Sequence, residues 1–527
     1  MNFGRTRVSS PWVDATGLAL VVALPALFAR PWADERVYVY WPEQIAGRNP
    51  LLLLVRVLEE IPGYLQLGVF RWLSRLVTFL ENWVILRASL AVGLPVNVVR
   101  AIPKALMVLA LATVLVATLR QYRQARPHHE TDRSWTVLMG TTAVVFAASL
   151  TIFRPSTHPL TLFPSLYLGT AAVALGIPLM LGRMKLNEHL LADSPRSLGV
   201  LRGTALAAMG IGIASMIELA YLALPLSIVH LALLDRCAFG SQESRERTFL
   251  SSLAVRAWLM ITGGFLVVFI PIRVVIARIC SNGGCYQAAA PGFTLDLLEV
   301  WPRRLLSGAF PVMQYNQRDL VADALRANKD LFVIGLMAAA FASWLLWRSW
   351  AIEREAVPSR HNGWMGAAAL YFGVVLVLAT GLASLSREVQ QQDLGLTPWR
   401  ESGFSWVAWT GLVAVVVTVA IQRLSHLPQV GLAVVLVAAV LMASVQNQAD
   451  MLTVRSQPEG RLHNQIAASL ADFDRSDRGN MHRCAITNEL LAFPEAEPNR
   501  FPFLVGLLDA VAINHYGLPF CSPSEAT

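Results

Sequence analysis

The chain has 527 residues, of which 55% are hydrophobic and 15% are charged, and its formal net charge is +8. Soluble domains carry roughly 25% charged residues, so this composition excludes an ordinary soluble protein. Many apolar runs approach or exceed the roughly 20 residues that span a bilayer core, and they are continuous, which argues against a membrane β-barrel. The basic residues form no stripe with interleaved aromatic residues, so nucleic acid is not expected as a partner. The sequence predicts an all-α, polytopic membrane protein.

The first apolar run, residues 15–29, follows Arg5 and Arg7 as the core of a signal peptide would. No small-residue cleavage site ends this run, so we expect a retained first span with the N-terminus in the cytoplasm. Ten further spans bring the expected total to about eleven transmembrane helices. These ten lie near residues 102–120, 135–153, 161–181, 203–219, 221–235, 257–278, 331–349, 364–385, 405–422 and 429–446.

The cytoplasmic connections of this topology are short and rich in Arg, for example "RQYRQARPHHETDR" and "DRCAFGSQESRER". This is the charge distribution that the positive-inside rule requires. Residues 203–235 allow two interpretations. They form either a tight hairpin broken near Pro225 or one long helix, which would invert the orientation of every later span.

The cysteines favour the hairpin. Cys280 and Cys285 bracket the turn "CSNGGC", Cys484 and Cys521 lie near the C-terminus, and Cys237 stands alone in an Arg-rich loop. Disulfides persist outside the cytoplasm and rarely form within it. The eleven-span topology places both possible pairs outside and the single thiol inside. We therefore expect the disulfides Cys280–Cys285 and Cys484–Cys521, with free thiols at these positions as the alternative.

Three segments are expected on the extracytoplasmic side. The first outer loop, about residues 32–100, contains apolar stretches punctuated by charges, such as "YLQLGVFRWLSRLV". Because arginine in the bilayer core costs several kcal/mol, we expect juxtamembrane helices in the interface plane here rather than two additional spans. The second segment covers about residues 279–330. The third, residues 447–527, is expected to be a small extracytoplasmic C-terminal region that docks on the outer loops of the transmembrane region, residues 1–446.

The first outer loop carries a family resemblance. An acidic pair, Asp34 and Glu35, directly follows the first span in "ADERVYVYWPEQIAG", and "PGYLQLGVFRWLSRLV" comes after it. This arrangement resembles bacterial envelope-polysaccharide members of the GT-C glycosyltransferase superfamily. The match covers about residues 14–120 and is only architectural beyond them. It departs from the family before Gly63, where "VRVLEEIP" replaces an aromatic-rich approach.

The resemblance implies a reaction and its partners. Such enzymes transfer a sugar from a polyprenyl-phosphate donor to a glycan or lipid acceptor on the outer face of the bacterial cytoplasmic membrane. Inverting transfer needs a base for the acceptor hydroxyl, and the resemblance favours Asp34 over Glu35 for that role. Arginines would hold the lipid phosphate. The candidate phosphate ligands near the outer face are Arg303, Arg304, Arg154 and His158. Contact with lipid headgroups alone is the alternative role of each arginine.

Other functional signals are few. No metal-ligand cluster, phosphate loop or Ser-His-Asp arrangement stands out, so no metal site is predicted, and a divalent cation is left open as a cofactor. Glu218 is expected to meet water at the outer turn of the hairpin, with a place in a substrate path or proton relay as the alternative. His230 is expected to be a hydrogen-bonded packing residue.

Three alternative functions remain. A transporter or flippase of lipid-linked sugars would show internal repeats and matching Gly/Pro-broken spans, and no convincing repeat is present. A polysaccharide polymerase or ligase would place its arginines in later outer loops. For a non-catalytic membrane subunit, the acidic pair would be dispensable.

Overall fold

The computed structural model describes residues 11–30, 35–125, 132–151, 158–190, 199–238, 252–281, 285, 291–309, 312, 315, 318–327, 329–350, 363–391, 399–456, 458–492 and 500–522. Within these residues all regular structure is helical, apart from one isolated bridge between Pro291 and Ser386. The described part of the chain is therefore all-α, and its long apolar helices fit a polytopic membrane protein.

Eight helices in the described part of the chain are long and apolar enough to cross a membrane. A helix satisfies its own backbone hydrogen bonds, which is why continuous apolar runs become helices in lipid. These eight are α6 (Val96–Gln124), α8 (Pro164–Leu190), α10 (Ala223–Ala238) with the 3-10 turn η1 (Glu218–Leu222) before it, α12 (Leu253–Cys280), α16 (Asp330–Trp350), α17 (Gly363–Ser384), α19 (Ser402–Ile421) and α20 (His426–Ser456).

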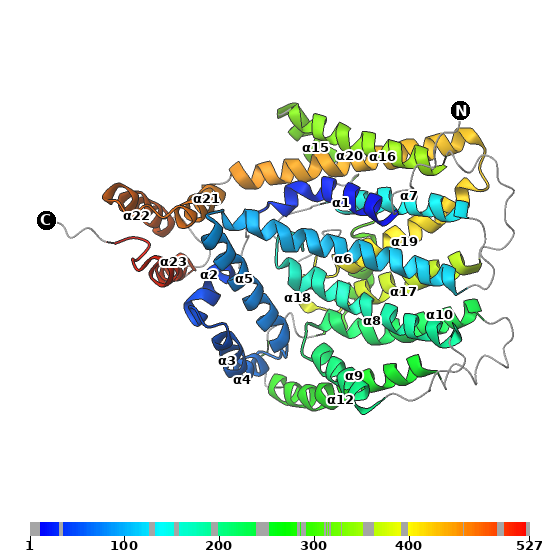
Figure 1. Ribbon diagram of the computed structural model, residues 1–527, viewed down its shortest axis with the longest axis horizontal. Coiled ribbons are helices and arrows are strands. Elements are labelled where there is room, and N and C mark those ends of the chain that lie inside the picture. Colours follow the sequence, from blue (N-terminus) through cyan, green and yellow to red (C-terminus); the bar gives the residue numbers. More distant parts are fainter. Residues whose placement is uncertain are drawn as a thin grey trace.

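Three shorter apolar helices lie among the eight long ones, at positions where the sequence predicts spans. They are α1 (Pro11–Leu27), α7 (Asp132–Ser149) and α9 (Val200–Ala214). Helix α1 packs against α7, α6 and α20, and α9 packs against α12. In Figure 1 the long and short helices run roughly side by side in one bundle.

The hairpin at residues 203–235 is broken earlier than expected. Helix α9 ends at Ala214, and the turn after it is held by the beginning of α5 (Trp72–Val92). The Leu73 N–H donates to the Ser215 carbonyl over 3.1 Å, and the Ile217 N–H donates to Ser74 Oγ over 3.0 Å. The interpretation as one long helix is wrong, and so is the expected break near Pro225, because contacts with α5 determine where the chain turns.

Close packing fixes α9 on α12. A Cβ added to Gly210 would lie 1.9 Å from the Ile261 carbonyl oxygen, and one added to Gly264 would lie 2.1 Å from the Ala207 carbonyl oxygen. Small residues of this kind allow the backbones of two membrane helices to touch. A larger side chain at Gly210 or Gly264 would force the two helices apart.

Residues 35–92, most of the predicted first loop, form four helices at one end of the bundle (Figure 1). They are α2 (Glu35–Ala46), α3 (Leu51–Glu59), α4 (Ile61–Gln66) and α5. The C-terminal helices α21 (Pro458–Ala471), α22 (Asp477–Leu491) and α23 (Arg500–Tyr516) gather at the same end (Figure 1). The short helices between later spans are α13 (Asp296–Leu306), α15 (Arg318–Ala327) and α18 (Arg387–Gln391).

The C-terminal helices share an apolar core with α2 and α5. Val39 and Leu86 are buried with Ile466 and Leu507 in this core. Disulfides join Cys280 to Cys285 and Cys484 to Cys521, the two pairs expected from the sequence, and Cys237 belongs to neither disulfide. The C-terminal region is thus packed on the first-loop helices and stapled internally.

Candidate functional site

A buried ion pair joins the start of α2 to α6. The Arg100 guanidinium on α6 donates to the Glu35 carboxylate, and both side chains are buried. The same carboxylate accepts the backbone N–H of Phe163 over 2.9 Å. Asp34, the predicted base, lies outside the described residues. Glu35 is the next residue in the chain, and its contacts with Arg100 and the Phe163 N–H hold it in place.

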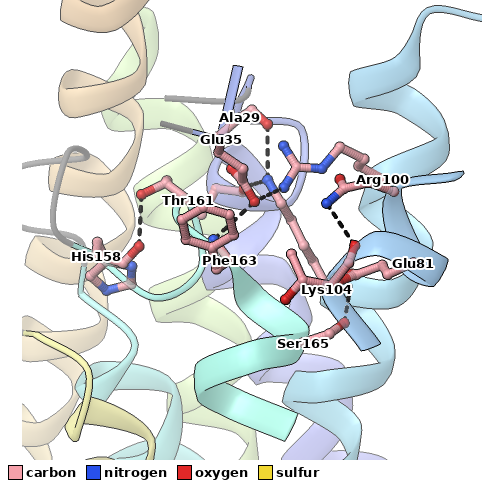
Figure 2. Close-up of polar contacts among 12 residues, drawn as sticks. Ala29, Glu35, Glu81, Arg100, Lys104, His158, Thr161, Phe163 and Ser165 are labelled. Carbon is pink, nitrogen blue, oxygen red and sulfur yellow. Dashed lines mark hydrogen bonds and ion pairs between the residues drawn. The ribbon is translucent and has the colours of Figure 1, made fainter. Parts of the chain in front are cut away.

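Lys104 lies one helical turn after Arg100, and its side chain caps carbonyl groups at the C-terminal end of α1. Its Nζ donates to the Ala29 carbonyl over 2.8 Å and to the Ala26 carbonyl over 3.2 Å, and the side chain is fully buried. The last carbonyls of a helix have no partner within the helix, so a cation there is stabilising. Figure 2 shows the Glu35, Arg100 and Lys104 side chains converging beside Phe163.

Glu81 on α5 adds a second acidic group to this cluster. Its carboxylate accepts a hydrogen bond of 2.5 Å from Ser165 Oγ, at the beginning of α8 (Figure 2). Burial raises the pKa of Glu81, whereas the hydrogen bond from Ser165 and the positive charge of Arg100 lower it. We use the name charged cluster for Glu35, Glu81, Arg100 and Lys104.

An apolar groove of about 720 Å³ lies next to the charged cluster, between α5, α6 and α8. Its polar lining consists of Glu81 and Ser165, whereas side chains such as Val84 and Ile102 are exposed along it. The lining residues are Val77, Leu80, Glu81, Val84, Ile85, Ala88, Val99, Ile102, Pro103, Met107, Ser165, Gly169, Val173 and Met216. The arrangement suits a ligand with an apolar chain and a polar head.

Three of the predicted phosphate ligands, Arg303, Arg304 and His158, do not line this groove. Arg304 is buried in an ion pair with Glu401, and Arg303 is a partly exposed side chain whose guanidinium lies 2.5 Å from Glu299 on the same helix. Neither residue lines the groove. Arg154 lies outside the described residues.

His158 is fully buried. Its ring lies 5.2 Å from the Trp406 ring centroid, and its Nδ1 accepts the Leu160 N–H over 3.1 Å. Burial lowers the pKa of His158 from 6.5 to about 3. The role of His158 as a phosphate ligand stays a prediction, and in this buried position it would act by donating a hydrogen bond.

This burial predicts a pH dependence of stability. Between pH 6.5 and about 3 the unfolded chain binds a proton at His158 that the folded chain does not, so folding stability falls as the pH falls through this range. We expect His158→Gln to make the decrease in unfolding temperature between pH 7 and pH 5 smaller. His482→Gln, at an exposed position, is the control and should leave the slope unchanged. If the unfolding temperature of His158→Gln fell with pH as steeply as that of the parent protein, the lowered pKa of His158 would be contradicted.

Sequence reasoning missed most of the charged cluster. Arg100 and Lys104 lie at the beginning of the span predicted at residues 102–120, and long basic side chains near helix ends commonly reach the membrane interface. Glu81 lies in a predicted juxtamembrane helix among several charges. Their pairing depends on how three helices meet. Glu218 lies at the hairpin turn, half-buried, as expected, and His230 is a hydrogen-bonded packing residue whose partners are Tyr122 and Gln121.

The described residues contain no group of three or more His, Cys, Asp or Glu side chains that could hold a metal ion. Comparison with known proteins gives no relative. No protein-family model, no curated protein sequence and no solved structure matches this chain.

Proposed function

We propose that the protein transfers a sugar from a polyprenyl-phosphate donor to a glycan or lipid acceptor at the outer face of a bacterial cytoplasmic membrane. The observation that carries this proposal is the charged cluster at an apolar groove of about 720 Å³. A polyprenyl-phosphate sugar has one long apolar chain and one polar head. The groove offers an apolar surface for the chain, and the cluster offers hydrogen-bonding groups for the sugar.

Asp34 is the proposed base, a role that comes from the resemblance of the first outer loop. It takes the proton of the acceptor hydroxyl while that oxygen attacks the anomeric carbon. The bond between the anomeric carbon and the phosphate oxygen breaks, and the lipid phosphate leaves with the bonding electrons. Glu35 is a positioning residue in this proposal, because its carboxylate is already occupied by Arg100 and the Phe163 N–H. Glu81, which lines the groove, accepts a hydrogen bond from the sugar.

The same proposal includes eleven spans, with the first-loop helices outside the cytoplasm. Both disulfides support this orientation, because such bonds form outside the cytoplasm. Cys280 and Cys285 lie against Gly68, between α4 and α5, and Cys484–Cys521 lies within the C-terminal helices. Cys237 is near the end of α10, the helix that leads away from the turn held by α5.

Reconstitution of the full chain in vesicles tests the proposal. Protease access to the C-terminal region reports which way the protein is inserted. We expect glycosylated acceptor and free polyprenyl phosphate to form only when the donor is in the leaflet on the C-terminal side. Movement of the donor between leaflets without any product would contradict the proposal and favour a flippase.

A further inference from the structure

A second cavity, of about 360 Å³, lies on the other side of the start of α8. Ser165 lines the groove and Tyr167 lines this cavity, as expected for residues about 200° apart around a helix. The lining residues are Arg71, Tyr167, Ile217, Glu218, Leu219, Arg273, Pro291, Leu382, Ala383, Leu385, Ser386, Trp399 and Arg400. We call this space the arginine cavity.

Three arginines from separate parts of the chain line the arginine cavity, with a single glutamate. Arg71 precedes α5, Arg273 lies on α12, and Arg400 precedes α19. The nearest Arg273 and Glu218 atoms are 3.9 Å apart, and the two side chains are 33% and 35% exposed. So long and so hydrated an ion pair contributes little. Arg400 also pairs with Glu388, which lies outside the lining, with the nitrogen and oxygen 3.4 Å apart. Counting both glutamates, the three arginines leave a net positive charge of about one at this cavity, which the phosphate group of a bound ligand would neutralise.

The rest of the lining is mainly apolar. Leu382, Ala383 and Leu385 come from the end of α17 and the turn after it, and Ile217 and Leu219 come from the hairpin turn. A small free anion would leave these side chains uncovered. An anion attached to an apolar chain would cover them and gain hydrophobic burial in addition to its charge interactions.

We propose that the arginine cavity binds the phosphate group of a membrane lipid. Guanidinium groups match phosphate oxygens in pairs of hydrogen bonds, and the apolar lining accepts the first carbons of the lipid chain. This site is separate from the groove and does not depend on the proposed transfer reaction. It gives the protein a place for a second lipid, on the opposite side of α8.

Native mass spectrometry of the full chain in detergent tests the site by counting bound molecules. The probe is a short-chain isoprenyl monophosphate, compared with the matching isoprenol and with inorganic phosphate. Removing a charged hydrogen-bonding group costs about 10-fold to 100-fold in affinity. We expect the double variant Arg71→Gln and Arg273→Gln to lose one bound isoprenyl phosphate. Arg278→Gln, an exposed position further along α12, is the control and should lose none.

The binding measurements decide whether the arginine cavity holds a lipid phosphate. Equal binding of isoprenol and isoprenyl phosphate, or unchanged binding in the double variant, would overturn the proposal. Inorganic phosphate binding as tightly as the lipid would also overturn it. Displacement of the probe by phosphatidylglycerol would identify a general phospholipid site, and resistance to displacement would identify an isoprenyl phosphate site. Ala88→Trp fills the groove and should leave the molecule in the arginine cavity in place. A loss of sugar transfer in this variant can therefore be told apart from a loss of lipid binding in the arginine cavity.

Discussion

Asp34→Asn is expected to slow sugar transfer by about 10²–10⁴-fold, the range typical of losing a general base. Asparagine keeps the size of the side chain and most of its hydrogen-bonding capacity, but it cannot take a proton from the acceptor hydroxyl. Donor binding should persist, because the groove and the cluster do not change. The measurement is the rate of transfer in reconstituted vesicles, with donor binding followed in parallel.

Two further variants make this result specific. Asp296→Asn changes an exposed carboxylate at the start of α13 and should leave the rate unaltered. Glu81→Gln keeps a hydrogen-bonding side chain in the groove and should reduce transfer less than Asp34→Asn does. Full activity in a correctly folded Asp34→Asn protein would remove the acidic pair from the mechanism and place the transporter interpretation first.

Arg100→Ala is expected to destabilise the protein by about 3–5 kcal/mol, because removing one partner leaves the other charge buried without compensation. The Glu35 carboxylate would keep the Phe163 N–H as a donor but lose the guanidinium. The double variant Arg100→Met and Glu35→Leu should recover most of this stability, since replacing both members of a buried pair with apolar groups is often neutral. Unfolding in detergent, monitored against temperature and denaturant, gives the comparison.

Arg303→Ala is the matched control for Arg100→Ala. Arg303 pairs with Glu299 on the same helix, and the two side chains are 43% and 66% exposed. Exposed pairs contribute about 1 kcal/mol or less. If Arg100→Ala lost no more unfolding free energy than Arg303→Ala, the Glu35–Arg100 pair would not be what holds α2 on α6.

The helices of the bundle were predictable because hydropathy acts locally. Each long helix coincides with a continuous apolar run, and the backbone in lipid has no better way to satisfy its hydrogen bonds. The positions of the paired cysteines followed from the same topology. The turn at Ser215 was not predictable, because α5 holds it through Leu73 and Ser74. The helix-breaking tendency of Pro225 carries no information about the contact between this turn and α5.

The charged cluster lay beyond sequence reasoning for a related reason. Glu35 and Arg100 are 65 positions apart, and Glu35 and Phe163 are 128 apart. Arg304 looked available for a phosphate, yet a partner 97 positions away, Glu401, occupies it. A single sequence shows which charges lie near the membrane surface but not which of them meet.

An experimental structure of the full chain in a lipid nanodisc, with a non-transferable polyprenyl-phosphate sugar analogue, would show directly whether the groove holds the sugar donor. We expect the lipid chain to lie in the groove between α5, α6 and α8, with the sugar within hydrogen-bonding distance of Asp34 and Glu81. An analogue bound elsewhere, with the groove filled only by bulk lipid and Asp34 far from the sugar, would contradict this expectation.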